Sequence, residues 1–176
     1  FVNNGIWELQ AINLQGNGGT NSLVNNATLR KVGPGTSTAN IPFTNNAAIN
    51  VQAGTLDFNS TTYTAVPAAN INVSSGASLN LNSMTLAGTV NCTGLGNFAT
   101  TGTLTVSGNV TTTTTSPLQI LSNVNVTAGN SLTNQGLIST SGGGNLNYGG
   151  PLVNGNNGTW IENSNTRFFA NSSFVN

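Results

Sequence analysis

Three acidic residues are the only carboxylates that this sequence offers for acid–base chemistry: Glu8, Asp57 and Glu162. A glycosidase needs two carboxylates within roughly 10 Å of each other, on either side of the bond that it cleaves. Glu8 and Glu162 follow a Trp in similar phrases, but they lie near opposite ends of the chain. Asp57 lies in the phrase TLDF, where alternation turns it outward. The three acids are therefore expected to be separate surface groups.

The other groups that catalysis uses are also scarce. The chain has no His and one Cys, Cys92, so neither a Ser-His-Asp triad nor a His/Cys metal site is available. No Gly-rich loop ending in Lys is present to bind phosphate. Cys92 has no internal disulfide partner and no nearby base, and it is expected to be a small buried apolar residue. We expect a protein that is not an enzyme and that binds no metal ion or cofactor.

Charge is nearly absent from the chain. Only 3% of the 176 residues are charged and the net charge is zero, so Asn, Thr, Ser and Gly supply the polarity. Nucleic acids and anionic membrane surfaces both require a basic face, and the one adjacent basic pair, Arg30-Lys31, is expected in an exposed turn. No apolar run approaches the roughly 20 residues of a membrane-spanning helix. We expect neither a nucleic-acid partner nor membrane insertion.

A short phrase recurs along the chain. It appears as FVNNG at Phe1, LVNNA at Leu23, FTNNA at Phe43, LTNQG at Leu132, LVNGN at Leu152 and FVN at Phe174. The copies at Phe1, Leu23 and Phe43 lie 22 and 20 residues apart, and those at Leu152 and Phe174 lie 22 apart. The gap of 109 residues from Phe43 to Leu152 divides into five steps of about 22, and the copy at Leu132, 20 residues before Leu152, lies inside it. A second phrase appears as INVQAG at Ile49, INVSSG at Ile71 and VNVTAG at Val124. These spacings predict stacked coils in which each phrase marks one point of the period.

Each coil is expected to consist of short strands. Segments such as TLDF, LNLNSMTL and TLTV alternate apolar residues with Asn or Thr, which is typical of a strand with one buried face. Residues 1–176 are therefore predicted to form one all-β unit, a right-handed parallel β-helix of about eight coils of 20–25 residues, with Asn side chains stacked at its turns. An antiparallel sandwich or barrel is the alternative, because it also has short alternating strands.

The phrases FVNNGIWELQ, LVNNATLRKVG, FTNNAAINVQAGTLDF and LVNGNNGTWIENSNTRFFANSSFVN cover much of the chain. They resemble the Asn/Gly/Thr-rich repeat regions of large secreted bacterial surface proteins, namely the β-helix passengers of autotransporter and filamentous-haemagglutinin-type adhesins. The resemblance implies a parallel β-helix, a location outside the cell or on a bacterial surface, and an adhesive or scaffolding role. It identifies no binding residue. This chain departs from such proteins in its shortness and its scarcity of charge.

Several residues are candidates for contact with partners. A cell-surface glycan could stack on Trp7, Trp160, Tyr63 or Tyr148, although the two Trp residues could instead shield the interior or a corner of the solenoid. The run Thr111–Thr115 is interpreted as an outward Thr strand, with an ice-binding face as the alternative.

The two ends of the chain are the remaining candidates. Open strand edges must be capped or paired, so Phe1, Val2, Phe174 and Val175 are expected to stack on a continuation of the chain or on another subunit. We therefore expect a structural or adhesive segment of an extracellular filament. Its main partner is expected to be another copy of the chain or a continuation of the same chain. The alternatives are a carbohydrate-binding module and, after it, an ice-binding protein.

Overall fold

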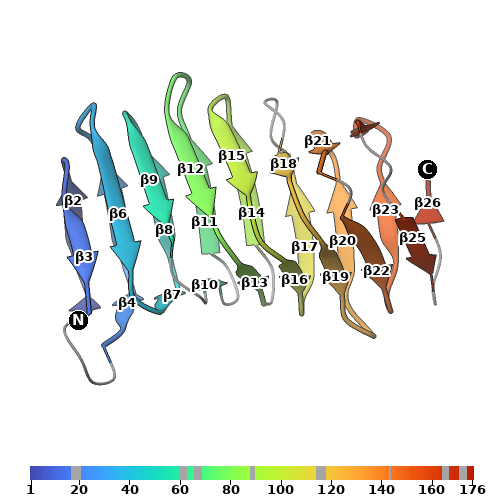
Figure 1. Ribbon diagram of the computed structural model, residues 1–176, viewed down its shortest axis with the longest axis horizontal. Coiled ribbons are helices and arrows are strands. Elements are labelled where there is room, and N and C mark those ends of the chain that lie inside the picture. The colour runs from blue at the N-terminus through green and yellow to red at the C-terminus, as the bar shows by residue number, and fades with distance from the viewer. Residues whose placement is uncertain are drawn as a thin grey trace.

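The protein is a stack of parallel strands wound into a solenoid. The computed structural model describes residues 1–16, 21–59, 63–65, 69–87, 90–113, 118–142, 144–163, 167–170 and 174–176. The regular structure of these residues is entirely β-strand, and every recorded strand pair is parallel. Figure 1 shows the coils side by side, from the N-terminal end in blue to the C-terminal end in red. The predicted parallel β-solenoid is confirmed, and the antiparallel alternative is wrong.

Three sheets form the faces of the rod, and successive strands of the chain enter them in the order A, B, C. Sheet A contains β1 (Val2–Asn3), β4 (Leu23–Asn25), β7 (Phe43–Asn45), β10 (Tyr63–Ala65), β13 (Met84–Leu86), β16 (Leu104–Val106), β19 (Val124–Val126), β22 (Asn145–Tyr148) and β25 (Arg167–Ala170). Sheet B contains β2 (Ile6–Leu9), β5 (Thr28–Lys31), β8 (Ala48–Val51), β11 (Ala69–Val73), β14 (Val90–Gly94), β17 (Asn109–Thr112), β20 (Ser131–Asn134), β23 (Leu152–Asn154) and β26 (Phe174–Val175). Sheet C contains β3 (Asn13–Gln15), β6 (Thr36–Asn40), β9 (Thr55–Phe58), β12 (Ser78–Leu81), β15 (Asn97–Thr100), β18 (Leu118–Ile120), β21 (Leu137–Thr140) and β24 (Thr159–Glu162). Eight or nine described strands per sheet is close to the eight coils expected.

Alternation of side chains gives each strand one buried face. In β8, Ile49 and Val51 point into the tube while Ala48 and Asn50 lie on its outer side. A shift of one residue would expose the apolar pair, so burial specifies the register of every strand. The core is one continuous cluster of Leu, Ile, Val and Phe side chains from successive coils. Within it the rings of Phe43 and Phe58 stack with their centroids 4.6 Å apart.

A ladder of buried Asn side chains forms the corner between sheets A and B in the first coils. The amide nitrogen of Asn3 donates to Oδ1 of Asn25 at 2.7 Å, and the amide nitrogen of Asn25 donates to Oδ1 of Asn45 at 2.7 Å. Asn25 also donates to the backbone carbonyl of Ala48 at 2.9 Å. Each amide thus links one coil to the next and satisfies a corner carbonyl, which makes burial of this polar group favourable.

A second ladder occurs in the last coils, at a different corner. The hydroxyl of Thr112 donates to Oδ1 of Asn134 at 3.0 Å, and the amide of Asn134 donates to Asn154 at 2.9 Å. Asn154 then donates to Oδ1 of Asn176 at 2.8 Å. Thr112, Asn134 and Asn154 are the last residues of strands of sheet B, and Asn176 follows β26 of the same sheet, so this second ladder lines the corner between sheets B and C.

The recurring phrase therefore does not mark one point of the period, which corrects the sequence-based interpretation. Phe1, Leu23 and Phe43 begin copies in sheet A, whereas Leu132, Leu152 and Phe174 begin copies in sheet B. The register that starts at Phe43 reaches Leu146 after five coils, not Leu152. The segment between Phe43 and Leu152 therefore spans five coils and, in addition, the corner that leads from sheet A to sheet B.

The second phrase shows the same displacement. INVSSG begins in β11 of sheet B, whereas VNVTAG coincides with β19 of sheet A. Each phrase ends in a glycine at positive φ, Gly76 at 78° and Gly129 at 77°. A side chain is disfavoured in this conformation, so the two turns require Gly for the same reason at different corners. The recurring phrases therefore indicate which type of corner follows a strand, and they do not indicate to which sheet the strand belongs.

Replacing Asn25 with Leu should destabilise the protein by about 2 kcal/mol, because it leaves the amide of Asn3 and Oδ1 of Asn45 buried without their partner. The matched control is Asn26→Leu. Asn26 belongs to an outer, solvent-exposed ladder with Asn4 and Asn46, where water replaces lost bonds, so the change should stay within about 0.5 kcal/mol. Urea unfolding followed by circular dichroism measures both. Equal losses in the two variants would contradict a special role for the buried ladder.

Candidate functional site

The acidic side chains are far apart, as the sequence predicted. Glu8 lies in sheet B and pairs with Arg30 at 3.4 Å, whereas Asp57 and Glu162 lie in sheet C. Five strand spacings separate Asp57 from Glu162, which is about 24 Å. Asp57 is turned outward and half-buried, and loss of solvent raises the pKa of its carboxyl. No group of three or more His, Cys, Asp or Glu side chains occurs among the described residues.

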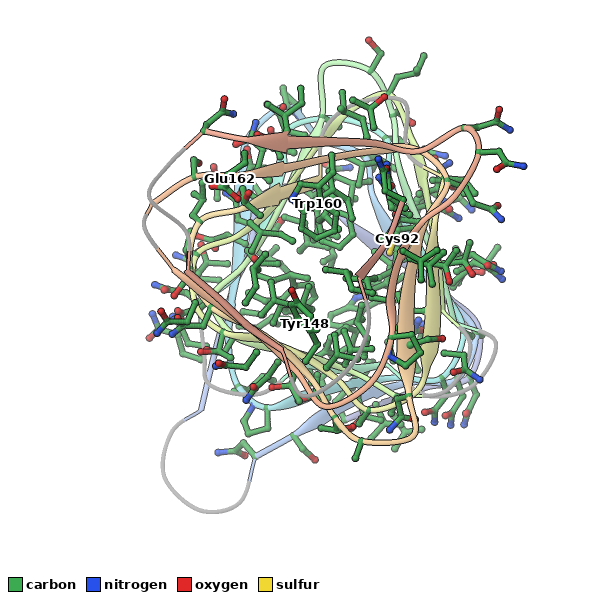
Figure 2. The ribbon with its side chains drawn as sticks, turned by 90° about the vertical axis from the view of Figure 1, so that its right-hand side faces the viewer. Cys92, Tyr148, Trp160 and Glu162 are labelled. Carbon is green, nitrogen blue, oxygen red and sulfur yellow. The ribbon has the colours of Figure 1, made fainter. Side chains whose placement is uncertain are left out.

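Glu162 lies at the C-terminal part of the rod. It shares a register position with Thr140 of the preceding coil, and the Thr140 hydroxyl donates to its carboxylate. Figure 2 looks along the rod from this side and shows Glu162 beside the interior, with the ring of Trp160 deeper in the tube. The carboxylate therefore ends a column of inward residues, and the second carboxylate that acid–base catalysis needs is not among its described neighbours.

Cys92 is buried, as predicted. It stands in the inward column of sheet B between Ile71 and Thr112, and its side chain is a free thiol. Burial raises the pKa of the thiol to about 12, because the thiolate would lose its hydration. Near neutral pH the group is protonated and enclosed, so its environment suits a packing residue rather than a nucleophile.

Lys31 is a buried basic residue, which the sequence did not predict. The sequence placed Arg30-Lys31 in an exposed turn, but both residues belong to β5, and the side chain of Lys31 is 0% exposed. This corrects the sequence interpretation, because in TLRK the inward positions are those of Leu29 and Lys31. In register, the neighbours of Lys31 are Leu9 and Val51.

The ammonium of Lys31 is held by backbone oxygens rather than by an acid. It donates to the carbonyl of Gly33 and to the carbonyl of Ala53 at 3.3 Å. Loss of solvent lowers the pKa of the amine. The group therefore links two successive corners between sheets B and C, at an electrostatic cost.

The aromatic residues proposed for glycan contact lie largely inside the tube. Tyr148 is only 4% exposed and belongs to the core, where burial raises the pKa of its phenol. This corrects its assignment as a surface platform, and Figure 2 shows its ring within the cross-section. Trp7 and Trp160 are partly buried and pack against the core, in agreement with the alternative that they shield the interior. The side chain of Tyr63 lies outside the described residues.

In the described part of the run at 111–115, namely 111–113, the side chains do not form an outward Thr strand. Thr111 faces outward, but Thr112 is fully buried in the second ladder, and Thr113 lies beyond the end of β17. Thr114 and Thr115 lie outside the described residues. A regular polar column does occur, but on sheet A, where the register aligns Thr44, Thr64, Thr85, Thr105, Asn125 and Asn147 on successive coils.

The polar columns of sheets A and B differ in how their side chains are used. On sheet B two recorded pairs bond to one another, with Asn72 donating to Thr93 at 2.9 Å and Asn91 to Asn70 at 3.2 Å. On sheet A, within the described residues, no side-chain hydrogen bond is recorded for Thr85, Thr105, Asn125 or Asn147. Thr85, Thr105, Asn125 and Asn147 of sheet A thus form a polar surface whose donors and acceptors are directed to solvent.

The first and last strands of each sheet present the other candidate surface. Phe1, Val2 and Ile6 are exposed at the N-terminal end, where the Phe1 ring lies 4.7 Å from that of Trp7. Ile161 and Val175 are exposed at the C-terminal end, while the side chain of Phe174 lies outside the described residues. The unpaired backbone edge of a strand can pair with another strand, and exposed apolar side chains beside it favour that contact.

Comparisons with family models, with curated proteins and with solved structures found no match to this chain. In the described residues, no helix is long and apolar enough to span a membrane. The candidate sites therefore depend on the geometry of the chain itself.

Lys31→Met should alter how stability depends on pH. The unfolded chain keeps the ordinary Lys pKa of 10.5 and the folded chain has a lower one, so between these values the unfolded state binds more protons. The free energy of unfolding of the natural chain should therefore rise with pH across this window, relative to Lys31→Met. Denaturant titrations of both proteins from about pH 7 to about pH 10 measure the difference. Cys92 and Tyr148 titrate in both proteins, so parallel pH profiles would contradict a costly buried ammonium.

Proposed function

We propose that this chain is a non-enzymatic structural or adhesive segment of an extracellular rod or filament at a bacterial surface. The observation that carries the proposal is the unbroken parallel pairing of all three sheets, from β1, β2 and β3 to β24, β25 and β26. Such pairing joins the described coils into one shaft, because every coil hydrogen-bonds to its neighbours along the axis. A shaft of this kind acts by stiffness and by display of its faces.

The chemistry of the outer faces supports the same role. Asn, Thr and Ser side chains cover the strands, and the exposed ion pair of Glu8 and Arg30 is a local exception. Uncharged polar faces make weak contacts that do not depend on salt. Repetition of such faces along a rod converts weak contacts into avidity. The separation of Asp57 from Glu162 supports a role without acid–base catalysis.

Electron microscopy of the source bacterium, labelled with gold-conjugated antibody against this chain, tests the structural role. We expect label along extracellular rods or filaments, because the described coils form an elongated shaft. Antibody pre-absorbed with the purified chain is the control. Label confined to the cell interior, or to particles without elongated shape, would contradict the proposal.

A second candidate function is binding of an uncharged polysaccharide along sheet A. The observation that favours it is the column that includes Thr85, Thr105 and Asn125, whose hydroxyls and amides have no recorded partner within the described part of the chain. A polysaccharide offers hydroxyl groups at regular intervals, so repeated hydrogen bonds could form along the column.

The variant Thr105→Lys should reduce polysaccharide binding at least tenfold if sheet A is the binding face, because it places a charged side chain in the middle of the column. Sedimentation with insoluble polysaccharides and glycan arrays measure binding. The matched control is Thr111→Lys, which makes the same change on the outer face of sheet B. Equal binding by both variants and the natural chain would exclude sheet A as the contact surface.

A further inference from the structure

Asn-Gly pairs are the chemically reactive sequences of this chain. The backbone nitrogen of the residue after an Asn can attack the side-chain carbonyl carbon of that Asn, and Gly hinders the attack least because it has no side chain. Asn-Gly occurs four times, at Asn4, Asn17, Asn154 and Asn157. Asn17 lies outside the described residues. The pairs at Asn154 and Asn157 are three residues apart, so the structure allows a direct comparison between them.

Hydrogen bonds hold every group of the Asn154-Gly155 pair that this reaction uses. Oδ1 of Asn154 accepts from the amide nitrogen of Asn134 at 2.9 Å, and the Asn154 amide nitrogen donates to the carbonyl of Gly158 at 3.0 Å. The backbone nitrogen of Gly155, which would make the attack, donates to the carbonyl of Asn134 at 2.8 Å. Reaction at this pair therefore requires local opening of the second ladder.

The corner after Asn154 is two residues longer than the corner after Asn134 in the preceding coil. The two Asn residues are in register, and so are Leu137 and Thr159, which begin the strands that follow. Two residues join the strands in the preceding coil, whereas residues 155–158 join them in this one. The strands keep their register, so the two extra residues are accommodated as a turn on the outside of the corner.

Asn157 lies in this outer turn. The backbone nitrogen of Gly158 donates to the carbonyl of Gly155 at 2.7 Å, which places Asn156 and Asn157 at the two central positions of the turn. Both Asn side chains are exposed, and no hydrogen bond of the Asn157 side chain is recorded among the described residues. The Asn157 amide is therefore free to rotate, and a single bond within the turn holds the nitrogen that would attack it.

We propose that Asn157 is a site of spontaneous deamidation in the folded protein, and that the second ladder protects Asn154 from the same reaction. The backbone nitrogen of Gly158 forms a bond to Cγ of Asn157, the Cγ–Nδ2 bond breaks, and Nδ2 leaves as ammonia with the proton of the backbone N–H. Water then adds to one of the two carbonyls of the cyclic imide and opens the ring. The product is aspartate or isoaspartate, and water is the only co-reactant.

The reaction has different consequences at the two positions. The natural chain has a formal net charge of zero, so one new carboxylate changes the net charge from 0 to −1. At Asn157 this carboxylate is hydrated, and the folded structure should tolerate it. At Asn154 a carboxylate would face the carbonyl of Gly158 without a proton to donate, which is unfavourable in the ladder. Protection of Asn154 thus preserves the bonds between coils.

Incubation of the purified protein in mildly alkaline buffer tests the inference, with a parallel sample unfolded in urea. Both samples are then digested with pepsin in acid, where deamidation is slow. Cleavage after Leu152 and Trp160 gives one peptide that contains both pairs, and tandem mass spectrometry assigns the conversion of amide to acid to one Asn or the other. In the folded protein, Asn157 should react at least about tenfold faster than Asn154, because more hydrogen bonds hold the latter. In urea the two rates should be similar.

Three variants examine the origin of the protection. Asn134→Ala removes the side chain that holds Oδ1 of Asn154, so the folded variant should deamidate severalfold faster at Asn154 and at an unchanged rate at Asn157. The matched control is Thr133→Ala, on the outer face of the same strand, which should leave both rates unchanged. Asn157→Gln should abolish the acidic species that isoelectric focusing resolves in the incubated natural chain.

Each result supports or overturns the inference. Deamidation in the folded protein that is as slow at Asn157 as at Asn154, or as fast at Asn154 as at Asn157, would overturn it. A difference in urea as large as that in the folded protein would also overturn it, because the neighbouring sequence would then explain the protection. If Asn134→Ala does not fold, the comparison of the folded and urea-treated natural chain still decides. The inference does not depend on the proposed structural role, which the gold-labelled images test separately.

Discussion

The structure depends on one requirement, that each coil match the next coil column by column. Strands of successive coils are joined by backbone hydrogen bonds at a fixed spacing, so each interior side chain lies between the residues at the same register position of the coils before and after it. Asn25 satisfies this requirement because Asn3 and Asn45 stand before and after it. Thr100 does not, since its column neighbours are Leu81 and Ile120 and its hydroxyl has no partner. Buried amides are therefore stabilising when they occur on consecutive coils.

Much of the architecture could be predicted from local pattern. Alternation in segments such as TLDF specifies which residues face inward, and the spacing near 22 residues predicts stacked coils. The pattern also gave the outward position of Asp57 and the burial of Cys92. These features follow from a strand's own residues, so no knowledge of other coils was needed.

Features that depend on three-dimensional columns were not predictable in the same way. A ladder Asn makes the same bonds at either corner, so the phrases at Phe43 and Leu152 look equivalent although they belong to different sheets. Lys31 was misinterpreted because adjacent basic residues usually indicate a solvated turn. Its inward position was nevertheless available from its spacing of two residues from Leu29, and the carbonyls that hold it belong to corners of two coils.

The position of the basic side chains has a consequence for resistance of the solenoid to proteolysis. Proteases that cut after Lys or Arg have three target residues in this chain. Two of them, Arg30 and Lys31, lie in β5, which is paired on one side with β2 and on the other with β8. Such an enzyme must bind an extended, unpaired segment, so cleavage there first requires local unfolding. Burial of Lys31 in a strand paired on both sides, costly for folding, thus removes a cleavage site from the reach of such proteases.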